Sequence, residues 1–180
     1  MIKNDGLCEH LVGIHLPDVA LLSTDGMVVN LSKLTATTVV YCYPMTSQPG
    51  VPHPANWDEI PGARGCTQQS YSYKDNFSEL SKLNAVIYGM STQDTDYQKE
   101  MTERFQLPYS ILSDSKFEYC DILNIPTFIV GGKRLIKRVT MIIEDGVIEA
   151  VHYPILQSAS DPDWVIAHLS TKNRNATGTP

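Results

Sequence analysis

Short hydrophobic runs alternate along the chain with segments in which hydrophobic residues recur every three or four positions. The runs are rich in β-branched and aromatic residues, which predicts strands, some of them buried on both faces. We expect strands at 37–43, 85–90, 109–112, 127–130, 139–143 and 147–153. Two Asp-Gly pairs mark tight turns. Asp25-Gly26 predicts an N-terminal hairpin within residues 19–31, and Asp145-Gly146 joins the last two strands.

The amphipathic segments predict four helices, at 67–83, 94–105, 115–123 and 161–169. In the first of these, Tyr73, Phe77 and Leu80 recur at helical spacing. In the last, Asp161 takes the cap position and Pro162 the first helical position. Proline is well tolerated there because the amide it lacks would have no partner inside the helix.

Strands and helices alternate through the middle of the chain, and an antiparallel pair closes it. This order predicts a three-layer α/β domain with a mixed central sheet. Because there is no repeat and no linker, we expect one domain over residues 1–171 and a polar, flexible tail at 172–180. Between Met45 and Gly65 the chain holds four prolines and three glycines, which predicts a long loop. Irregular loops of this length inside a domain are more often functional than idle.

Composition and charge exclude several classes of protein. With 42% hydrophobic and 19% charged residues, the chain is neither disordered, collagenous nor a coiled coil. A net charge of −6 gives no basic surface for nucleic acid or an anionic membrane. The hydrophobic runs are too short to span a bilayer, and residues 1–5 lack the apolar core of a signal peptide. We therefore expect a soluble, cytoplasmic protein.

The four cysteines lie at positions 8, 42, 66 and 120. They are too far apart for a CxxC pair or a zinc knuckle, and too few for a disulfide scaffold. The five histidines form no metal-binding spacing, so we expect neither a metal nor a cofactor. Each cysteine is expected to be a reduced thiol, and small buried thiols are common in protein cores.

Cys66 differs from the other cysteines in its surroundings. It follows Gly65 at the point where the loop meets the first predicted helix. In the first turn of a helix, unpaired backbone N–H groups and the positive end of the dipole favour a thiolate. Arg64, two residues before it, would add to this effect. These surroundings favour a reactive thiol, with a structural thiol as the alternative.

Three segments resemble a peroxiredoxin, in particular the branch related to the bacterioferritin-comigratory peroxidases. The first joins a strand ending in Tyr43-Pro44 to the Gly65-Cys66-Thr67 turn and the helix after it. The second is Gln106-Leu-Pro-Tyr-Ser-Ile-Leu-Ser-Asp114, and the third is Arg138-Val-Thr-Met-Ile-Ile-Glu-Asp-Gly146. Together they cover roughly residues 15–155 in the order of the family.

The resemblance implies a thioredoxin-like fold with extra N-terminal strands, which agrees with the predicted elements. It also implies a thiol-dependent peroxidase that reduces hydrogen peroxide and organic hydroperoxides through a cysteine sulfenic acid. Cys66 takes the position of the peroxidatic nucleophile. Arg138 takes the position of the guanidinium that stabilises the thiolate and orients the peroxide. From the residues alone, Arg138 could instead cap the edge of the sheet.

The chain departs from the family pattern before its cysteine. The family places a threonine four positions and the cysteine seven positions after a proline. Here the threonine position after Pro44 holds Gln48, and Cys66 comes 22 positions after Pro44, an insertion of 15 residues. Thr46 is the candidate hydroxyl donor, with an ordinary turn residue as the alternative. The insertion is either a lid or specificity loop over the site or a dimer contact through Trp57.

A resolving cysteine is the second departure. Many relatives carry it five positions after the nucleophile, where this chain has Tyr71. Cys42 lies in a predicted buried strand, which leaves Cys120 or Cys8 as an unusual partner. We therefore expect turnover by one cysteine. The expected partners are a hydroperoxide substrate, a thioredoxin, glutaredoxin or small-thiol reductant and, for the assembly, a homodimer.

Two other functions stay open. Ile125-Pro126-Thr127-Phe128 resembles the proline-led strand of thioredoxins, which favours a thiol–disulfide oxidoreductase. The missing CxxC pair counts against that function, because such enzymes exchange electrons through two neighbouring thiols. The third hypothesis is a non-catalytic redox sensor or holdase on the same scaffold, with a pocket altered by the insertion.

Overall fold

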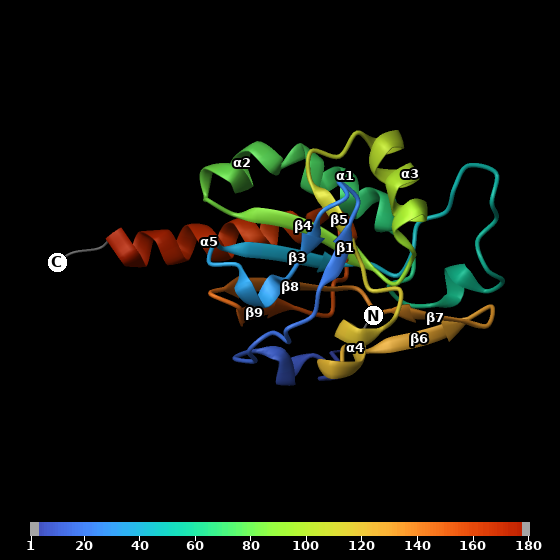
Figure 1. The fold of residues 1–180 in the computed structure, drawn as a ribbon, viewed down its shortest axis with the longest axis horizontal. Helices are drawn as coiled ribbons and strands as arrows, with labels where there is room; N and C mark the ends of the chain where they lie inside the picture. The colour runs from blue at the N-terminus through green and yellow to red at the C-terminus, as the bar shows by residue number, and fades with distance from the viewer. Residues whose placement is uncertain (1–3, 178–180) are drawn as a thin grey trace.

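A mixed sheet of seven strands forms the centre of the computed structural model, which describes residues 4–177 (Figure 1). The nine strands are β1 (Leu21–Ser23), β2 (Val28–Val29), β3 (Thr38–Cys42), β4 (Val86–Ser91), β5 (Ser110–Ser113), β6 (Thr127–Val130), β7 (Lys133–Ile136), β8 (Val139–Glu144) and β9 (Val147–His152). The five α-helices are α1 (Cys66–Asp75), α2 (Phe77–Lys82), α3 (Thr95–Phe105), α4 (Glu118–Ile122) and α5 (Asp161–Thr177).

The sheet has the order β2-β1-β5-β4-β3-β8-β9, and β6 and β7 form a second, two-stranded sheet. Strands β3, β4 and β5 run parallel, whereas β1 pairs antiparallel with β5 and β8 pairs antiparallel with β3. The predicted mixed α/β sheet with an N-terminal β1–β2 hairpin is therefore confirmed.

Two cores lie on the two faces of the sheet, and β3 contributes to both. Val39 and Tyr41 pack in the core beneath α1, α2, α3 and α5, whereas Val40 and Cys42 pack in the core beneath α4 and the N-terminal segment. This alternation follows from the two-residue period of a strand. Figure 1 shows α1, α2 and α3 on one side of the sheet and α4 on the other.

Three elements differ from the sequence-based expectation. The helix predicted over 67–83 is interrupted at Asn76, whose backbone N–H and side chain both donate to the Ser72 carbonyl. Strand β7 was not predicted, because the polar Lys133 and Arg134 hide its pattern. These two residues follow a Gly131-Gly132 turn, which joins β6 and β7 into a hairpin.

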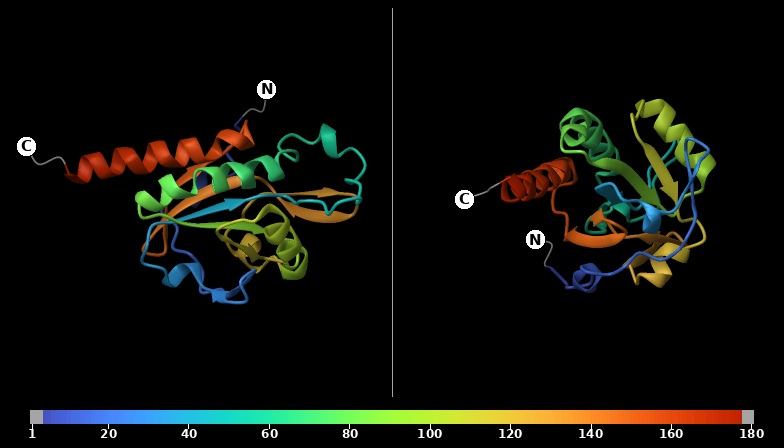
Figure 2. Two further views of the ribbon diagram at one scale, coloured as in Figure 1. Left: turned by 90° about the horizontal axis from the view of Figure 1, so that it is seen from above. Right: turned by 60° about the vertical axis from the view of Figure 1, so that its left-hand side comes forward.

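Helix α5 is longer than predicted and includes most of the segment expected to be a flexible tail. It runs to Thr177, beyond Leu169 (Figure 2). Lys172 holds this last part of the helix to β8 and β9 through ion pairs with Glu144 and Glu149. Residues 172–177, expected to belong to a flexible tail, are therefore helical in the structure, and residues 178–180 lie outside the described residues.

The long loop after β3 projects from one end of the molecule beside the β6–β7 hairpin (Figures 1 and 2). The two segments share a small core in which Met45, Trp57 and Ala63 pack against Val130 and Leu135. Trp57 is only 3% exposed. A dimer contact through Trp57 is therefore excluded in this structure, because the ring is already covered by its own chain.

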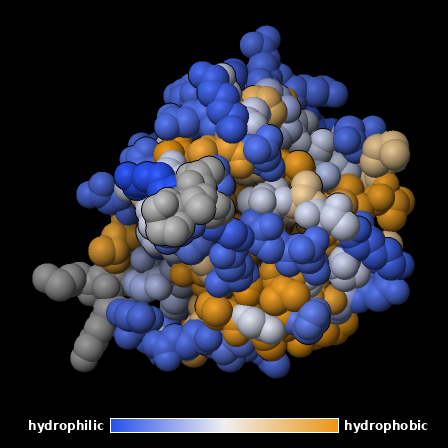
Figure 3. All heavy atoms as spheres, turned by 90° about the vertical axis from the view of Figure 1, so that its left-hand side faces the viewer, coloured by the Kyte–Doolittle hydropathy of each residue, from blue (hydrophilic) through white to orange (hydrophobic). Residues whose placement is uncertain are grey.

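The opposite end of the molecule has a mixed surface. Viewed from the end where α5 terminates, hydrophobic side chains lie in patches among hydrophilic ones (Figure 3).

Within residues 4–177, no helix combines the length and hydrophobicity needed to cross a bilayer.

Gly89 in β4 offers a test of how tightly the core under α1 is packed. A Cβ atom on this residue would lie 2.5 Å from Ile111 Cδ1 and 2.8 Å from Tyr41 Cζ. We expect Gly89→Ala to lower the free energy of unfolding by about 1–3 kcal/mol, because overpacking forces these side chains apart. Urea denaturation measures the change. As a control, Val86→Thr at an exposed position of the same strand should change stability by less than about 0.5 kcal/mol; equal losses for the two variants would contradict the prediction.

Candidate active site

Cys66 is the first residue of α1, and the turn before it requires glycine. Gly65 has a φ of 103°, and a Cβ atom there would lie 2.2 Å from Ser158 Oγ. Only glycine adopts this conformation and permits this approach at low cost. The carbonyl of Gly65 accepts the first helical hydrogen bond from the backbone N–H of Gln69 at 2.8 Å. The sulfur is thereby placed at the N-terminus of the helix, as predicted.

The Cys66 side chain is buried, with 4% of its surface exposed, and has two polar contacts. Arg138 Nη2 lies 3.1 Å from the sulfur, and the Ala63 carbonyl oxygen lies 3.6 Å from it. A guanidinium hydrogen and the positive end of a helix dipole both stabilise a negative charge on the sulfur. The site therefore combines the two features that favour a nucleophilic thiolate.

Arg138 lies between β7 and β8 and points inward, with 4% of its surface exposed. Its Nη1 donates to Gln69 Oε1. Besides the sulfur, Nη2 contacts the carbonyl oxygens of three consecutive loop residues, Gly62 at 3.1 Å, Ala63 at 3.4 Å and Arg64 at 3.0 Å. An arginine held this way does not cap the edge of a sheet, so that alternative is excluded by the geometry.

Arg64 was expected to add its positive charge to the site, but its side chain does not do so. Its side chain is 71% exposed and forms an ion pair with Asp58. Its backbone carbonyl, rather than its charge, faces the site, where it accepts from Arg138. Sequence proximity alone does not show that the Arg64 side chain turns toward Asp58 rather than toward Cys66.

A cavity of about 290 Å³ opens beside the sulfur. Its lining includes Thr46, Ser47, His53, Trp57 and Cys66. The structure thus brings Thr46 to the same cavity as Cys66 despite the insertion between them. The backbone of Thr46 is fixed on both sides by the Gln93 side chain, through bonds of 3.0 Å to its N–H and its carbonyl. The role of Thr46 as a hydroxyl donor stays a prediction.

The other three cysteines lie on the opposite face of the sheet. Cys8, Cys42 and Cys120 are buried in the core beneath α4, whereas Cys66 belongs to the core beneath α1. All four are free thiols. A disulfide between Cys66 and Cys8 or Cys120 would require movement across or around the sheet, because a disulfide needs Cα atoms within about 7 Å. Tyr71, at the usual resolving position, packs against Phe105.

Burial also makes these three thiols hard to ionise. It raises the pKa of Cys8 to about 12, and it raises the pKa values of Cys42 and Cys120 well above the ordinary value of a thiol. The cause is the loss of solvation for a thiolate in an apolar core. These sulfurs are therefore poor nucleophiles near neutral pH.

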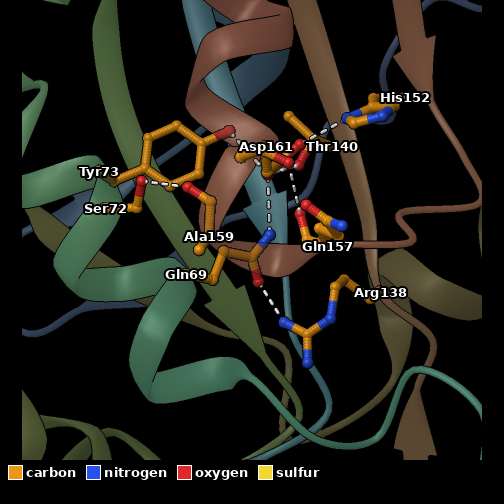
Figure 4. Close-up of polar contacts among 10 residues, drawn as sticks. Gln69, Ser72, Tyr73, Arg138, Thr140, His152, Gln157, Ala159 and Asp161 are labelled. Carbon is orange, nitrogen blue, oxygen red and sulfur yellow. Dashed lines mark hydrogen bonds and ion pairs between the residues drawn. The ribbon is translucent and has the colours of Figure 1, made fainter.

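Two polar residues of the site were not among the predicted site residues. Gln69 connects Arg138 to the buried carboxylate of Asp161 at the start of α5 (Figure 4). Gln69 lies three positions after Cys66, and this helical spacing was a signal that could have pointed to it. Asp161 was expected only to cap a helix. Nothing in the sequence places it next to α1, because that contact arises from the packing of α1 against α5.

The fold and this site define a thioredoxin-like protein with a single cysteine at the N-terminus of its first long helix. The Redoxin family model matches residues 11–163. A chloroplastic peroxiredoxin Q of Suaeda salsa is 30% identical over 157 residues, which cover 86% of this chain and 65% of that protein. A putative peroxiredoxin bcp of Coxiella burnetii is 28% identical over 148 residues, which cover 78% of this chain and 86% of that protein. Among solved structures, peroxidoxin BcpB of Mycobacterium tuberculosis aligns with a TM-score of 0.72 at 22% identity. The alignment covers 89% of this chain and 96% of that protein.

This chain belongs to the redoxin family, and its relatives place it among the peroxiredoxins, in the branch that contains peroxiredoxin Q and the bacterioferritin-comigratory proteins. The resemblance noted from three segments is thereby confirmed. The chain spans between 58% and 65% of the length of the first plant relatives that it matches.

The separation of the cysteines predicts selective alkylation. At pH 7, iodoacetamide should modify Cys66 and leave Cys8, Cys42 and Cys120 unmodified in the folded protein. Raising the pH to 9 should leave Cys8 unreactive, because its pKa of about 12 keeps it protonated. Mass spectrometry of peptides after a timed exposure measures this. Denaturation in urea should make all four react, and rapid modification of Cys8 without urea would contradict the burial described above.

Proposed function

We propose that this protein is a thiol-dependent peroxidase that reduces hydrogen peroxide and organic hydroperoxides. The observation that carries the proposal is the 3.1 Å contact between Arg138 Nη2 and the Cys66 sulfur at the start of α1. The cavity beside this sulfur supplies a place for a small substrate. A bacterioferritin comigratory protein of Xanthomonas campestris, which has a similar structure, is described as having alkyl peroxide reduction activity, and this supports the same substrate class.

In the proposed reaction, the Cys66 thiolate attacks one oxygen of the hydroperoxide. A sulfur–oxygen bond forms, the oxygen–oxygen bond breaks, and the sulfur is oxidised to a sulfenic acid. The leaving oxygen departs as an alkoxide or hydroxide and takes up a proton to become an alcohol or water. Negative charge therefore moves from the sulfur to the leaving oxygen. Donors already held at the sulfur lower the barrier because they need no reorganisation during this transfer.

Arg138 performs two tasks in this proposal. Its contact with the sulfur stabilises the thiolate before the reaction. The same guanidinium is available to the peroxide oxygens as the charge leaves the sulfur. Thr46 lines the cavity with Cys66 and is the proposed hydroxyl donor to the substrate. The inserted loop adds His53 and Trp57 to the wall, so we propose that it acts as a specificity loop.

An external thiol completes the proposed cycle. It attacks the sulfenic acid, water leaves, and a mixed disulfide with Cys66 forms. A second thiol then releases the reduced enzyme and a disulfide of the reductant. The placement of Cys8 and Cys120 on the other face of the sheet favours this one-cysteine cycle. Thioredoxin, glutaredoxin and small thiols are the proposed reductants.

The compartment and the assembly stay predictions. The relatives include plant proteins described as chloroplastic as well as a bacterial and a yeast protein, so a cytoplasmic location is our expectation only. A homodimer is likewise proposed without the Trp57 contact, because that side chain is buried within its own chain.

The first test compares peroxide consumption by the wild type and by Cys66→Ser with dithiothreitol as reductant. The wild type should consume hydrogen peroxide, and Cys66→Ser should not, because serine cannot form the sulfenic acid. Cys8→Ala and Cys120→Ala should retain turnover if Cys66 acts alone. Reduction of insulin disulfides without peroxide consumption would favour the oxidoreductase alternative. A sulfenic acid on Cys66 that no thiol reduces would favour the sensor.

The second test concerns Arg138. Arg138→Ala should slow the reaction of Cys66 with hydrogen peroxide by about 10²- to 10³-fold, since it removes a charged donor from a site with little water. Arg138→Lys should recover only part of the rate, because lysine lacks the planar set of donors. Stopped-flow measurement of sulfenic acid formation gives the rate constants. Arg64→Ala is the matched control and should stay within about twofold of the wild type; equal losses at positions 64 and 138 would overturn the assignment.

A further inference from the structure

Asp161 is a fully buried carboxylate that the proposed reaction does not use. Its Oδ2 accepts hydrogen bonds from three side chains, Gln69 Nε2 at 2.8 Å, Tyr73 Oη at 2.9 Å and Thr140 Oγ1 at 2.7 Å. Its Oδ1 lies 2.6 Å from His152 Nδ1. Figure 4 shows these groups converging on Asp161 from α1, β8, β9 and α5. A buried carboxylate is costly unless it is hydrogen-bonded. Its four partners here are side chains of other elements rather than backbone groups of α5, so Asp161 links elements instead of capping the helix.

The position of Asp161 determines how the Gln69 amide is oriented. An ionised carboxylate only accepts hydrogen bonds, and a guanidinium only donates them. Gln69 lies between the two, so its NH₂ group must face Asp161 and its Oε1 must face Arg138. The reversed amide would point a donor at Arg138 and an acceptor at Asp161. The chemistry of its two neighbours therefore fixes the orientation of the Gln69 side chain.

The orientation of Gln69 in turn affects the reacting sulfur. Gln69 Oε1 accepts from Arg138 Nη1, while Arg138 Nη2 contacts the Cys66 sulfur at 3.1 Å. The guanidinium is planar and rigid, so an acceptor at one nitrogen sets the direction of the other. If Gln69 reversed, its NH₂ group would repel Nη1, and the guanidinium would be held only by the carbonyls of residues 62–64, which do not fix its direction toward the sulfur.

From this chain of contacts we infer that Asp161 is a positioning residue for Cys66: by fixing the Gln69 amide, it holds the Arg138 guanidinium against the sulfur. It acts through two other side chains and touches neither substrate nor sulfur. The inference rests on the proposed function, because a change in the rate with hydrogen peroxide bears on catalysis only if the protein is a peroxidase. The contacts themselves, and the reactivity of Cys66 toward an alkylating agent, do not depend on peroxide reduction.

The inference separates two substitutions at the same position. Asp161→Leu removes the acceptor, so Gln69 should lose its fixed orientation. Asp161→Asn retains one acceptor oxygen, which should face Gln69, Tyr73 and Thr140 because all three donate; its NH₂ group would face His152, whose ring nitrogen can accept. We therefore expect Asp161→Leu to react with hydrogen peroxide at least about tenfold more slowly than the wild type, and Asp161→Asn within about threefold of it.

Alkylation of Cys66 gives a second readout that is independent of peroxide. In Asp161→Leu, the midpoint of the pH profile for iodoacetamide modification should move to higher pH, because the thiolate loses its guanidinium contact. In Asp161→Asn the profile should stay unchanged. If the wild type failed to consume peroxide, the proposed function would fall while this shift could still be observed.

A double-mutant cycle tests whether Asp161 acts through Gln69. Gln69→Leu breaks the same connection at its other end and should slow the peroxide reaction to a similar extent. In the Gln69→Leu background, adding Asp161→Leu should change the rate by no more than about twofold. Effects that multiply in the double variant would overturn the inference, as would wild-type rate and pH profile in Asp161→Leu.

Thr140→Val is the matched control for a purely structural effect. It removes another donor from the same Asp161 oxygen and leaves Gln69 untouched. We expect lower thermal stability with an unchanged alkylation profile. An alkylation shift in Thr140→Val equal to that in Asp161→Leu would contradict the inference, because it would show that any loss at Asp161 disturbs Cys66.

A second pair of variants covers the case in which Asp161→Leu does not fold. Gln69→Glu places two carboxylates against each other and should slow the reaction. Combining it with Asp161→Asn removes one of the two opposing charges and should recover part of the rate. Failure of the second substitution to recover any rate would overturn the inference.

Discussion

The contact between Arg138 and the Cys66 sulfur depends on a guanidinium that is almost completely buried. Such a charge is costly unless it is hydrogen-bonded. Here Nη1 donates to the side-chain oxygen of Gln69, and Nη2 contacts the carbonyls of residues 62–64 and the sulfur. The Arg138 side chain therefore fixes the loop that leads into α1. It also places a positive charge beside the Cys66 sulfur at the start of that helix. The structure of the turn and the reactivity of Cys66 have one physical cause.

The sheet keeps this sulfur apart from the other three. Strand β3 shows how: Tyr41 faces the core of Cys66, and Cys42, the next residue, faces the core of Cys8 and Cys120. On that second face, burial raises the pKa of the thiols, whereas on the first face a guanidinium and a helix N-terminus lie against the sulfur. Thiols of one chain thus differ in chemistry according to which face of the sheet they occupy.

The sequence was sufficient for much of the fold. Alternating hydrophobic runs and Asp-Gly turns predicted the mixed sheet, since those patterns reflect the burial of strands and the geometry of turns directly. Cys66 was singled out by its position at the start of a predicted helix, and Arg138 was found through motif resemblance; the structure brings the two together. The contact between Asp161 and Gln69 joins residues 92 positions apart through helix packing, so no local pattern encodes it. Arg64 shows the converse, because it is only two residues from Cys66 and its side chain pairs with Asp58 instead.

Both ends of the inserted loop meet at the site, which explains how the chain accommodates it. Thr46 lies near its start and residues 62–65 at its end, and all of these contact or surround Cys66. Lengthening a flexible connection from seven to 22 positions raises the closure cost by only about 1 kcal/mol, because the cost grows with the logarithm of length. Burial of Trp57 against the β6–β7 hairpin offsets part of the further cost of ordering the loop. Because Arg138 binds the end of the loop and Gln93 binds its beginning, the extra residues are added outside the geometry on which the sulfur depends.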